Sequence, residues 1–215
     1  MARWLRDSED PTNNEGDFPI APTDDSPESE IGTYISKEKI DKDEPKVDSK
    51  VRESIDQAWK LANEGHLVQA EVEFSKVIVN QPGVFQLLNY AQFLSRIGRL
   101  DQALAILDKV LEVSRESNDL INEASALVQQ AHLLEIRGDL DRAENMYKKA
   151  LEINEKLGRL ENMAKDYGNL GKVLETRGDL DRAEEMYKKA LKIATSAGFK
   201  SIATSVKQLL RKLKK

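Results

Sequence analysis

The residue types that could do chemistry are few and scattered. The chain of 215 residues has no cysteine and two histidines, His66 and His132, neither of which stands in a metal-ligand motif. Asp and Glu are plentiful, but 33% of all residues are charged, so chance carboxylate pairs carry no acid–base signal. No Gly-Lys-Ser/Thr phosphate loop and no nucleophile elbow occurs. The sequence therefore predicts a protein that is not an enzyme and that holds no cofactor or metal.

The compartment follows from the same composition. A chain without cysteine fits a reducing compartment. The N-terminus, MARWLRDSED, meets acidic residues before any apolar stretch of signal-peptide length begins, and nowhere do 18 apolar residues run together. We expect a cytoplasmic protein without a membrane span.

Residues 1–50 differ in composition from the rest. They contain five of the six prolines and 14 acidic against 7 basic residues, and nine carboxylates without a Lys or Arg lie from Asp7 to Glu30. Such a stretch cannot bury enough apolar surface to offset about 1 to 2 kcal/mol of backbone entropy per residue. We expect a disordered acidic tail over 1–50, either a solubilising leader or a regulatory or docking arm, and a folded body over 51–215.

The body is built from copies of one segment. Residues 137–153 read RGDLDRAENMYKKALEI, and residues 177–193, 40 positions further on, read RGDLDRAEEMYKKALKI. Weaker copies are IGRLDQALAILDKVLEV at 97–113 and EGHLVQAEVEFSKVIVN at 64–80. Self-similarity at a fixed period of this length is typical of stacked repeat proteins.

Each copy is predicted to form a helix, a tight turn and a second helix. Apolar residues recur at three- and four-residue steps on both sides of Gly178. A glycine can take the left-handed conformation that ends a helix, and Asp139 or Asp179 directly after it can cap the next one. Small residues are expected where the two helices of a copy cross, Gly171 on the first and Ala183 on the second, with the bulky Tyr187 filling the gap to the next hairpin. One hairpin cannot bury its apolar face alone, so the copies must stack into a solenoid.

This pattern resembles the tetratricopeptide repeat family. The matching residues of the third copy are Leu127, Ala131, Leu134, Gly138, Leu140, Ala143, Tyr147, Ala150 and Leu151, and those of the fourth are Tyr167, Leu170, Gly171, Leu174, Gly178, Leu180, Ala183, Tyr187, Ala190 and Leu191. The resemblance implies an all-α fold, a right-handed superhelical solenoid of helix-turn-helix repeats over about 51–82, 84–117, 120–157 and 160–196. Spacings of 40 rather than about 34 residues indicate a longer-repeat variant, also met in kinesin-light-chain-like proteins and cell-polarity adaptors.

The last segment is predicted to close the solenoid. Apolar residues from Phe199 to Leu213 follow helical spacing, so we expect a C-terminal capping helix over 199–214. Residues 200–215 carry six basic and no acidic residues, which leaves room for contact with an acidic partner or a membrane surface. Nucleic acid is an unlikely partner because no base-stacking aromatic residues lie nearby.

The resemblance also implies a binding surface, the concave groove lined by the first helix of each hairpin. Its inward-facing residues are predicted to be Asn89, Gln92, Arg96, Gln129, His132, Lys165, Asn169 and Lys172. Amide side chains can give a donor and an acceptor to the backbone of an extended peptide without demanding its sequence. Asn169 stands where the family often uses an asparagine for this purpose, and Asn89 matches in part. The family's two-carboxylate clamp for chaperone C-termini is not reproduced.

We therefore expect a non-catalytic protein–protein interaction scaffold or adaptor that binds an extended, acidic peptide in this groove. The acidic tail could make an intramolecular contact with the groove or with the basic cap. The alternative is an accessory or truncated subunit of a sensor or regulator whose catalytic or DNA-binding part is on another chain. That alternative predicts an exposed apolar patch on the first copy, formed by Ile55, Trp59 and Val72.

Overall fold

The computed structural model describes residues 48–79 and 82–213 of the chain. The predicted tail lies outside the described residues except for its last three, of which Ser49 and Lys50 already belong to a helix. The helices, in chain order, are α2 (Ser49–Asn63), α3 (Leu67–Val77), α4 (Val84–Arg96), α5 (Leu100–Glu116), α6 (Leu120–Ile136), α7 (Leu140–Lys156), α8 (Leu160–Arg177), α9 (Leu180–Ser196) and α10 (Lys200–Leu213).

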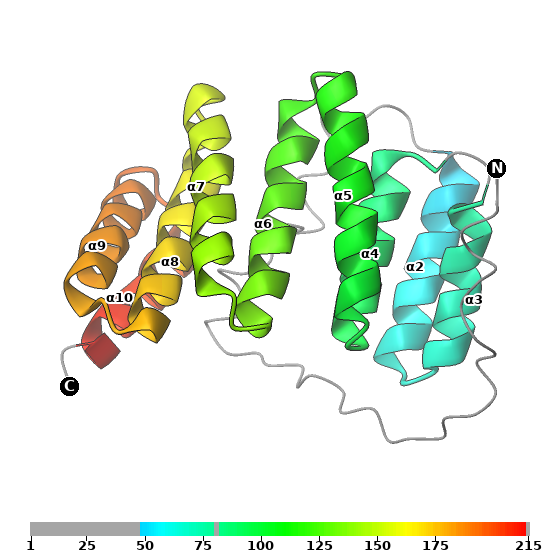
Figure 1. Ribbon diagram of the computed structural model, residues 1–215, viewed down its shortest axis with the longest axis horizontal. Coiled ribbons are helices and arrows are strands. Elements are labelled where there is room, and N and C mark those ends of the chain that lie inside the picture. The colour runs from blue at the N-terminus through cyan, green and yellow to red at the C-terminus, as the bar shows by residue number, and fades with distance from the viewer. Residues whose placement is uncertain (1–47, 80–81, 214–215) are drawn as a thin grey trace.

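The helices stand side by side as four antiparallel pairs and a final single helix (Figure 1). We call the first helix of each pair, α2, α4, α6 and α8, an A helix and the second, α3, α5, α7 and α9, a B helix. Every regular element in the described part of the chain is an α-helix. The predicted all-α solenoid of helical hairpins with a C-terminal capping helix is thus confirmed.

The A helices form the more closely packed layer. Contacts join α2 to α4, α4 to α6, and α8 to the terminal helix α10. The B helices α5 and α7 instead each pack between two A helices, so that α5 touches α4 and α6 and α7 touches α6 and α8. A stack whose layers differ in this way curves toward the tighter one. The concave groove is therefore expected on the side of the A helices.

The turns inside the third and fourth hairpins have the predicted chemistry. Gly178 ends α8 at φ 88°, in the left-handed region that favours glycine. The amide of Asp179 donates to the carbonyl of Leu174 at 2.9 Å, and the Asp179 side chain accepts from the amide of Arg182 at 3.3 Å. Asp139 caps α7 in the same way. Turn and cap are therefore set by two adjacent residues.

The crossing of α8 and α9 is closed by a ring over a glycine. Tyr187 is fully buried, and a Cβ atom added at Gly171 would lie 2.5 Å from the Tyr187 Cε1 atom, far inside van der Waals contact. The Tyr187 hydroxyl donates to Glu175 at 2.6 Å. The prediction placed Tyr187 in the gap to the next hairpin, whereas its ring packs on Gly171 of its own hairpin. This packing explains why no side chain larger than hydrogen fits at position 171.

The first hairpin is joined to the second by aromatic rings instead. Phe74 lies at the centre of this cluster, with ring centroids 4.9 Å from Phe93, 5.5 Å from Trp59 and 5.9 Å from Tyr90. Phe74 and Phe93 are fully buried. Edge and tilted arrangements of this kind are the favourable ones for aromatic pairs.

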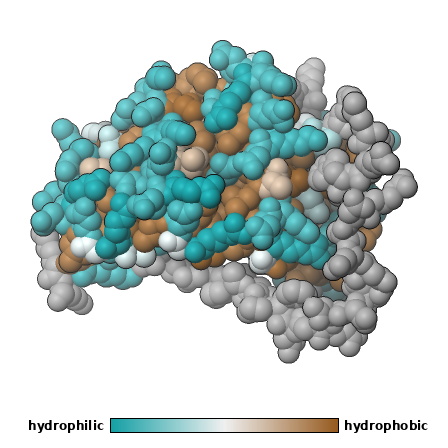
Figure 2. Space-filling model, in the orientation of Figure 1, coloured by the Kyte–Doolittle hydropathy of each residue, from teal (hydrophilic) through white to brown (hydrophobic). Residues whose placement is uncertain are grey.

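Hydrophilic side chains predominate on the face seen in Figure 2, with apolar side chains in strips between them. Buried apolar residues form one continuous core cluster from α2 to α8, and a second core cluster joins α8 and α9 to α10. No helix in the described residues is long and apolar enough to cross a membrane.

Candidate functional site

The predicted groove residues lie at repeating positions of three A helices. Asn89, Gln129 and Asn169 occupy one position on α4, α6 and α8, and Gln92, His132 and Lys172 occupy the next turn. A hydrogen bond and an ion pair from these helices reach the preceding A helix, so this face points toward the neighbouring A helices. Arg96 donates to Asn63 of α2 at 2.6 Å, and Lys172 pairs with Glu135 of α6 at 3.1 Å. We call the eight predicted residues together the A-helix surface.

The Asn89 side chain is held by hydrogen bonds within the fold. Its side chain is buried, its Oδ1 atom accepts from the indole nitrogen of Trp59 at 3.0 Å, and its Nδ2 atom donates to the carbonyl of Phe85 at 2.9 Å. The amide thus ties the second hairpin to the first. A peptide backbone could use Asn89 only by displacing one of these bonds.

Asn169 and Gln129 differ from Asn89 in this respect. Asn169 is only 3% exposed, yet its Nδ2 atom has no hydrogen-bond partner among the described residues. The Nε2 atom of Gln129, at the equivalent position one repeat earlier, is likewise buried without a partner there. A buried donor left unsatisfied costs about 1 to 3 kcal/mol. Two such donors at one repeating position are the clearest unmet polar groups on this surface.

The cations of the surface are paired with carboxylates that the sequence reasoning missed. Lys172 pairs with Glu135, and the buried Lys165 pairs with Glu161 at 3.2 Å. Glu161 lies four residues before Lys165, so helical spacing could have indicated it. Glu135 lies on another helix, and only the stacking of the hairpins brings it to Lys172. The surface is therefore less positive than the predicted residues alone indicate.

His132 lies between these groups. Burial lowers the pKa of its imidazole, and Lys172 lowers it further, while the nearby carboxylate of Glu135 acts in the opposite direction. The net shift is downward, so His132 is neutral at pH 7 and offers one donor and one acceptor. The Tyr147 hydroxyl donates to the other oxygen of Glu135 at 3.3 Å, and burial keeps the pKa of that hydroxyl well above its usual value.

A second set of charges runs along the edge where the hairpins turn. Arg177, at the end of α8, bonds to Asp141 at 2.5 Å and to Glu144 at 2.6 Å on α7. Glu144 also accepts from Arg182 at 2.9 Å and from Lys148 at 2.7 Å. Because these charged groups form ion pairs with one another, they join the hairpins and leave little charge for a ligand.

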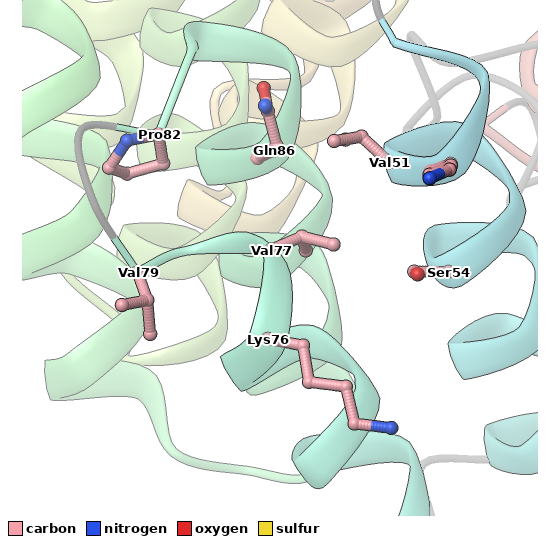
Figure 3. Close-up of a pocket in the computed structure, with 8 residues that line it drawn as sticks. Val51, Ser54, Lys76, Val77, Val79, Pro82 and Gln86 are labelled. Atoms are coloured by element: carbon pink, nitrogen blue, oxygen red, sulfur yellow. The ribbon is translucent and has the colours of Figure 1, made fainter.

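A pocket of about 320 Å³ lies at the N-terminal end of the solenoid (Figure 3). It is lined by Lys50, Val51, Ser54, Lys76, Val77, Val79, Pro82 and Gln86. Val51 of α2 points across the pocket toward Val77 of α3 and Gln86 of α4. No pattern in the sequence indicated this site, because its walls come from three helices and the segment after α3.

The apolar patch expected on the first copy is only partly present. Ile55 is 2% exposed and belongs to the core, and Trp59 is half-buried in the aromatic cluster. Val72 alone of the three residues is exposed, at 51%. Ile55 and Trp59 are covered because α2 packs on both α3 and α4, a contact that sequence comparison of single copies does not show.

Comparison with known protein families agrees with this architecture. The tetratricopeptide repeat profile matches residues 83–156 and 122–196, which correspond to α4–α7 and α6–α9 and together span more than half of the chain. The chain belongs to the tetratricopeptide repeat family. Members of this family are generally non-catalytic scaffolds for protein–protein interaction. No curated protein matches the chain.

Solved structures share the fold at low sequence identity. BtubC (BKLC) from P. vanneervenii is 19% identical, with a TM-score of 0.56 over 77% of this chain and 89% of that one. A protein described as a kinesin light chain with nearly identical TPR-like repeats, from Podosopora anserina, is 12% identical, with a TM-score of 0.57 over 79% of this chain and 97% of that one. At these identities the likeness is one of fold.

Proposed function

We propose that this chain is a non-catalytic scaffold that binds an extended, acidic peptide along the A-helix surface. The observation that carries the proposal is the pair of unpartnered amide nitrogens on Gln129 and Asn169. Each lacks the acceptor that a backbone carbonyl of a peptide would supply. Because the two amides repeat from one A helix to the next, one extended chain lying across the helices would meet both.

The preference for an acidic peptide rests on Lys172 and Lys165. Both are held by carboxylates, Glu135 and Glu161, that a ligand carboxylate could replace without leaving a cation unpaired. Such an exchange adds little affinity but selects against basic ligands, which would meet like charge. The neutral imidazole of His132 beside Lys172 adds one further donor and acceptor.

The acidic segment Asp7–Glu30, which lies outside the described residues, is proposed as an internal competitor for the A-helix surface or for the basic helix α10. Lys200, Lys207, Arg211 and Lys212 of α10 are all exposed. A tethered competitor raises the apparent dissociation constant of any peptide that uses the same surface. A full-length variant with the nine carboxylates of the segment changed to amides should bind peptide more tightly at low salt, and unchanged affinity contradicts the competition.

The direct test of the groove is selection from a random-peptide display library on the full chain. Selected peptides should be acidic, and Gln129→Ala/Asn169→Ala should weaken their binding about tenfold, because two hydrogen bonds of about 0.5 to 1.5 kcal/mol are lost. Asn145→Ala, an exposed amide on the B helix α7, is the matched control and should leave binding unchanged. Binders that ignore the double variant refute the proposed groove.

The accessory-subunit alternative has one observation in its favour, exposed valines on the first hairpin. It predicts that the purified chain is incomplete and associates with a further subunit there. The compartment that suits either function is the cytoplasm, as the absence of cysteine favours. Nucleic acid remains an unlikely partner under both readings.

A further inference from the structure

The outer face of α3 differs from the outer faces of the other B helices. Val68, Val72 and Val79 are 78%, 51% and 54% exposed. Val68 and Val72, four residues apart, lie on one side of α3, and Val79 follows the end of the helix. We call these three residues the valine strip. The equivalent positions in later copies, 33 residues on and then at steps of 40, are all exposed and hold Asp101, Ala105 and Glu112, then Asp141, Asn145 and Glu152, then Asp181, Glu185 and Lys192.

This contrast separates the valine strip from ordinary exposed apolar residues. Single apolar residues on a surface are common and need no explanation. Here eight of the nine equivalent residues in the later copies are polar or charged, whereas all three positions of the first copy hold valine, on α3 and just after it. A soluble solenoid keeps its outer face polar. The strip is therefore a surface that something covers.

The pocket at the N-terminal end continues the strip. Val79 belongs to both, and the pocket adds Val51 and Val77 as further apolar walls. Lys50 and Lys76 bring positive charge to its lining, and the Lys76 side chain is 57% exposed although it pairs with Glu73 at 2.6 Å. An occupant that fits this place carries apolar side chains next to carboxylates.

The chain itself enters the fold beside this pocket. Asp48 caps α2, and Lys50, Val51 and Ser54, in the first turns of that helix, line the pocket. The residues that precede Asp48 must therefore start next to it. Residues 31–44 read IGTYISKEKIDKDE, with apolar side chains at 31, 34, 35 and 40. Four carboxylates, at 38, 41, 43 and 44, and three lysines, at 37, 39 and 42, give the segment a net charge of −1, with most of the acid at its C-terminal end. Eight residues, from 40 to 48, can span up to about 26 Å.

We propose that residues 31–44 of this chain dock on the valine strip and its pocket. The side chains of Ile31, Tyr34 and Ile35, three and four residues apart, cover the strip, and the carboxylates at 41, 43 and 44 lie near Lys50 and Lys76. Contact with α3 supplies the apolar burial that this segment lacks when considered alone.

A second copy of the chain fits the same surface less well. Helix α3 has 11 residues and is about 16 Å long, so three valines on it form a small patch. A stable protein–protein interface buries about 800 Å² on each partner. The tethered segment needs no such area, because its effective concentration is set by the short linker to Asp48.

The test uses the full chain and a single spin label. The chain has no cysteine, so Ser36→Cys gives one attachment site. In a nitrogen-15 spectrum, the label should strongly broaden the amide signals of Val68 and Val72. The signals of Asn145 and Glu185, at equivalent positions on α7 and α9, serve as internal references and should keep their intensity.

Two full-length variants carry the decision. Tyr34→Ser/Ile35→Ser should abolish the broadening, whereas Phe18→Ser/Ile20→Ser, the matched loss of apolar side chains elsewhere in the tail, should preserve it. Circular dichroism should be the same for both. A label that leaves the α3 signals sharp overturns the proposal and leaves the strip to a partner subunit, and broadening that survives Tyr34→Ser/Ile35→Ser also overturns it. Broadening in a mixture of labelled and separately isotope-enriched chains assigns the contact to a second copy instead.

Discussion

The first and fourth hairpins share one architecture but are held by different interactions. Helices α2 and α3 have 15 and 11 residues and meet the next hairpin through four aromatic rings. Helices α8 and α9 have 18 and 17 residues, and Tyr187 closes their crossing over Gly171. Arg177 then links the fourth hairpin to the third by ion pairs. The glycine turn fixes the hairpin, and the contact between hairpins can be rebuilt from other side chains.

The largest expected effect lies in the aromatic cluster of the first hairpin. Phe74→Ala should lower the free energy of unfolding by about 3 to 5 kcal/mol, because it removes a fully buried ring that three other rings contact. Urea denaturation followed by circular dichroism measures the loss. Gln69→Ala, at an exposed position of the same helix, should change stability by less than about 0.5 kcal/mol. Equal effects of the two variants would mean that the rings do not hold the first hairpin.

The next effect separates the two groove asparagines. Asn89→Ala should cost about 1 to 3 kcal/mol, since it leaves the Trp59 indole and the Phe85 carbonyl without their partner. Asn169→Ala removes an amide nitrogen that has no partner among the described residues, so stability should change by about 0.5 kcal/mol or less. Thermal or urea unfolding of the two variants decides the matter. A large loss in Asn169→Ala would reveal a structural role in place of the proposed ligand contact.

The smallest effect concerns the ion pairs of the later hairpins and depends on pH. Burial acts to raise the pKa of Glu144, but hydrogen bonds from Lys148 and Arg182 outweigh it and hold that pKa below its usual value. A depressed pKa adds stability at neutral pH that disappears as the pH falls through the pKa of the folded protein. Glu144→Gln should therefore lower the free energy of unfolding by about 1 kcal/mol at pH 7. Near pH 3 the difference between the variant and the wild type should disappear.

The control for this prediction is Glu184→Gln, at the equivalent position of α9. Glu184 pairs with Lys188 on its own helix at 3.1 Å, and exposed pairs of this kind are worth about 0.5 kcal/mol or less. Urea midpoints of both variants and the wild type at the two pH values give the comparison. A Glu144→Gln variant as sensitive to acid as the wild type would show that other carboxylates carry the pH dependence.

The hairpins could be predicted because their causes are local. Gly178 and Asp179 define a turn and a cap within two positions, and the apolar period on each side defines both helices. A close helix crossing at Gly171 was predictable as well, because residue size at a repeating position indicates how closely two helices approach. The packing of the Tyr187 ring on Gly171 was not, because size alone does not tell which neighbouring helix a ring contacts.

The groove could be predicted only in outline because its contacts join different copies. Asn89 and Asn169 hold equivalent positions, but their environments depend on the preceding hairpin, which offers the indole of Trp59 to Asn89 and no acceptor among the described residues to the Nδ2 atom of Asn169. The Lys172–Glu135 pair has the same origin. Repeat alignment identifies which positions face the groove, whereas the partner of each depends on how far one hairpin is rotated against the next.

The aromatic cluster also gives the two ends of the molecule different optical signatures. Trp59 is the only tryptophan among the described residues, and the third and fourth hairpins contain tyrosine alone. In a Trp4→Phe variant, indole emission therefore reports water reaching the first hairpin, while circular dichroism averages over all helices. Solenoids can open from one end, and transitions seen by different probes then fail to coincide. Comparing the two signals in one denaturant series would show, without any added label, which end of this chain opens first.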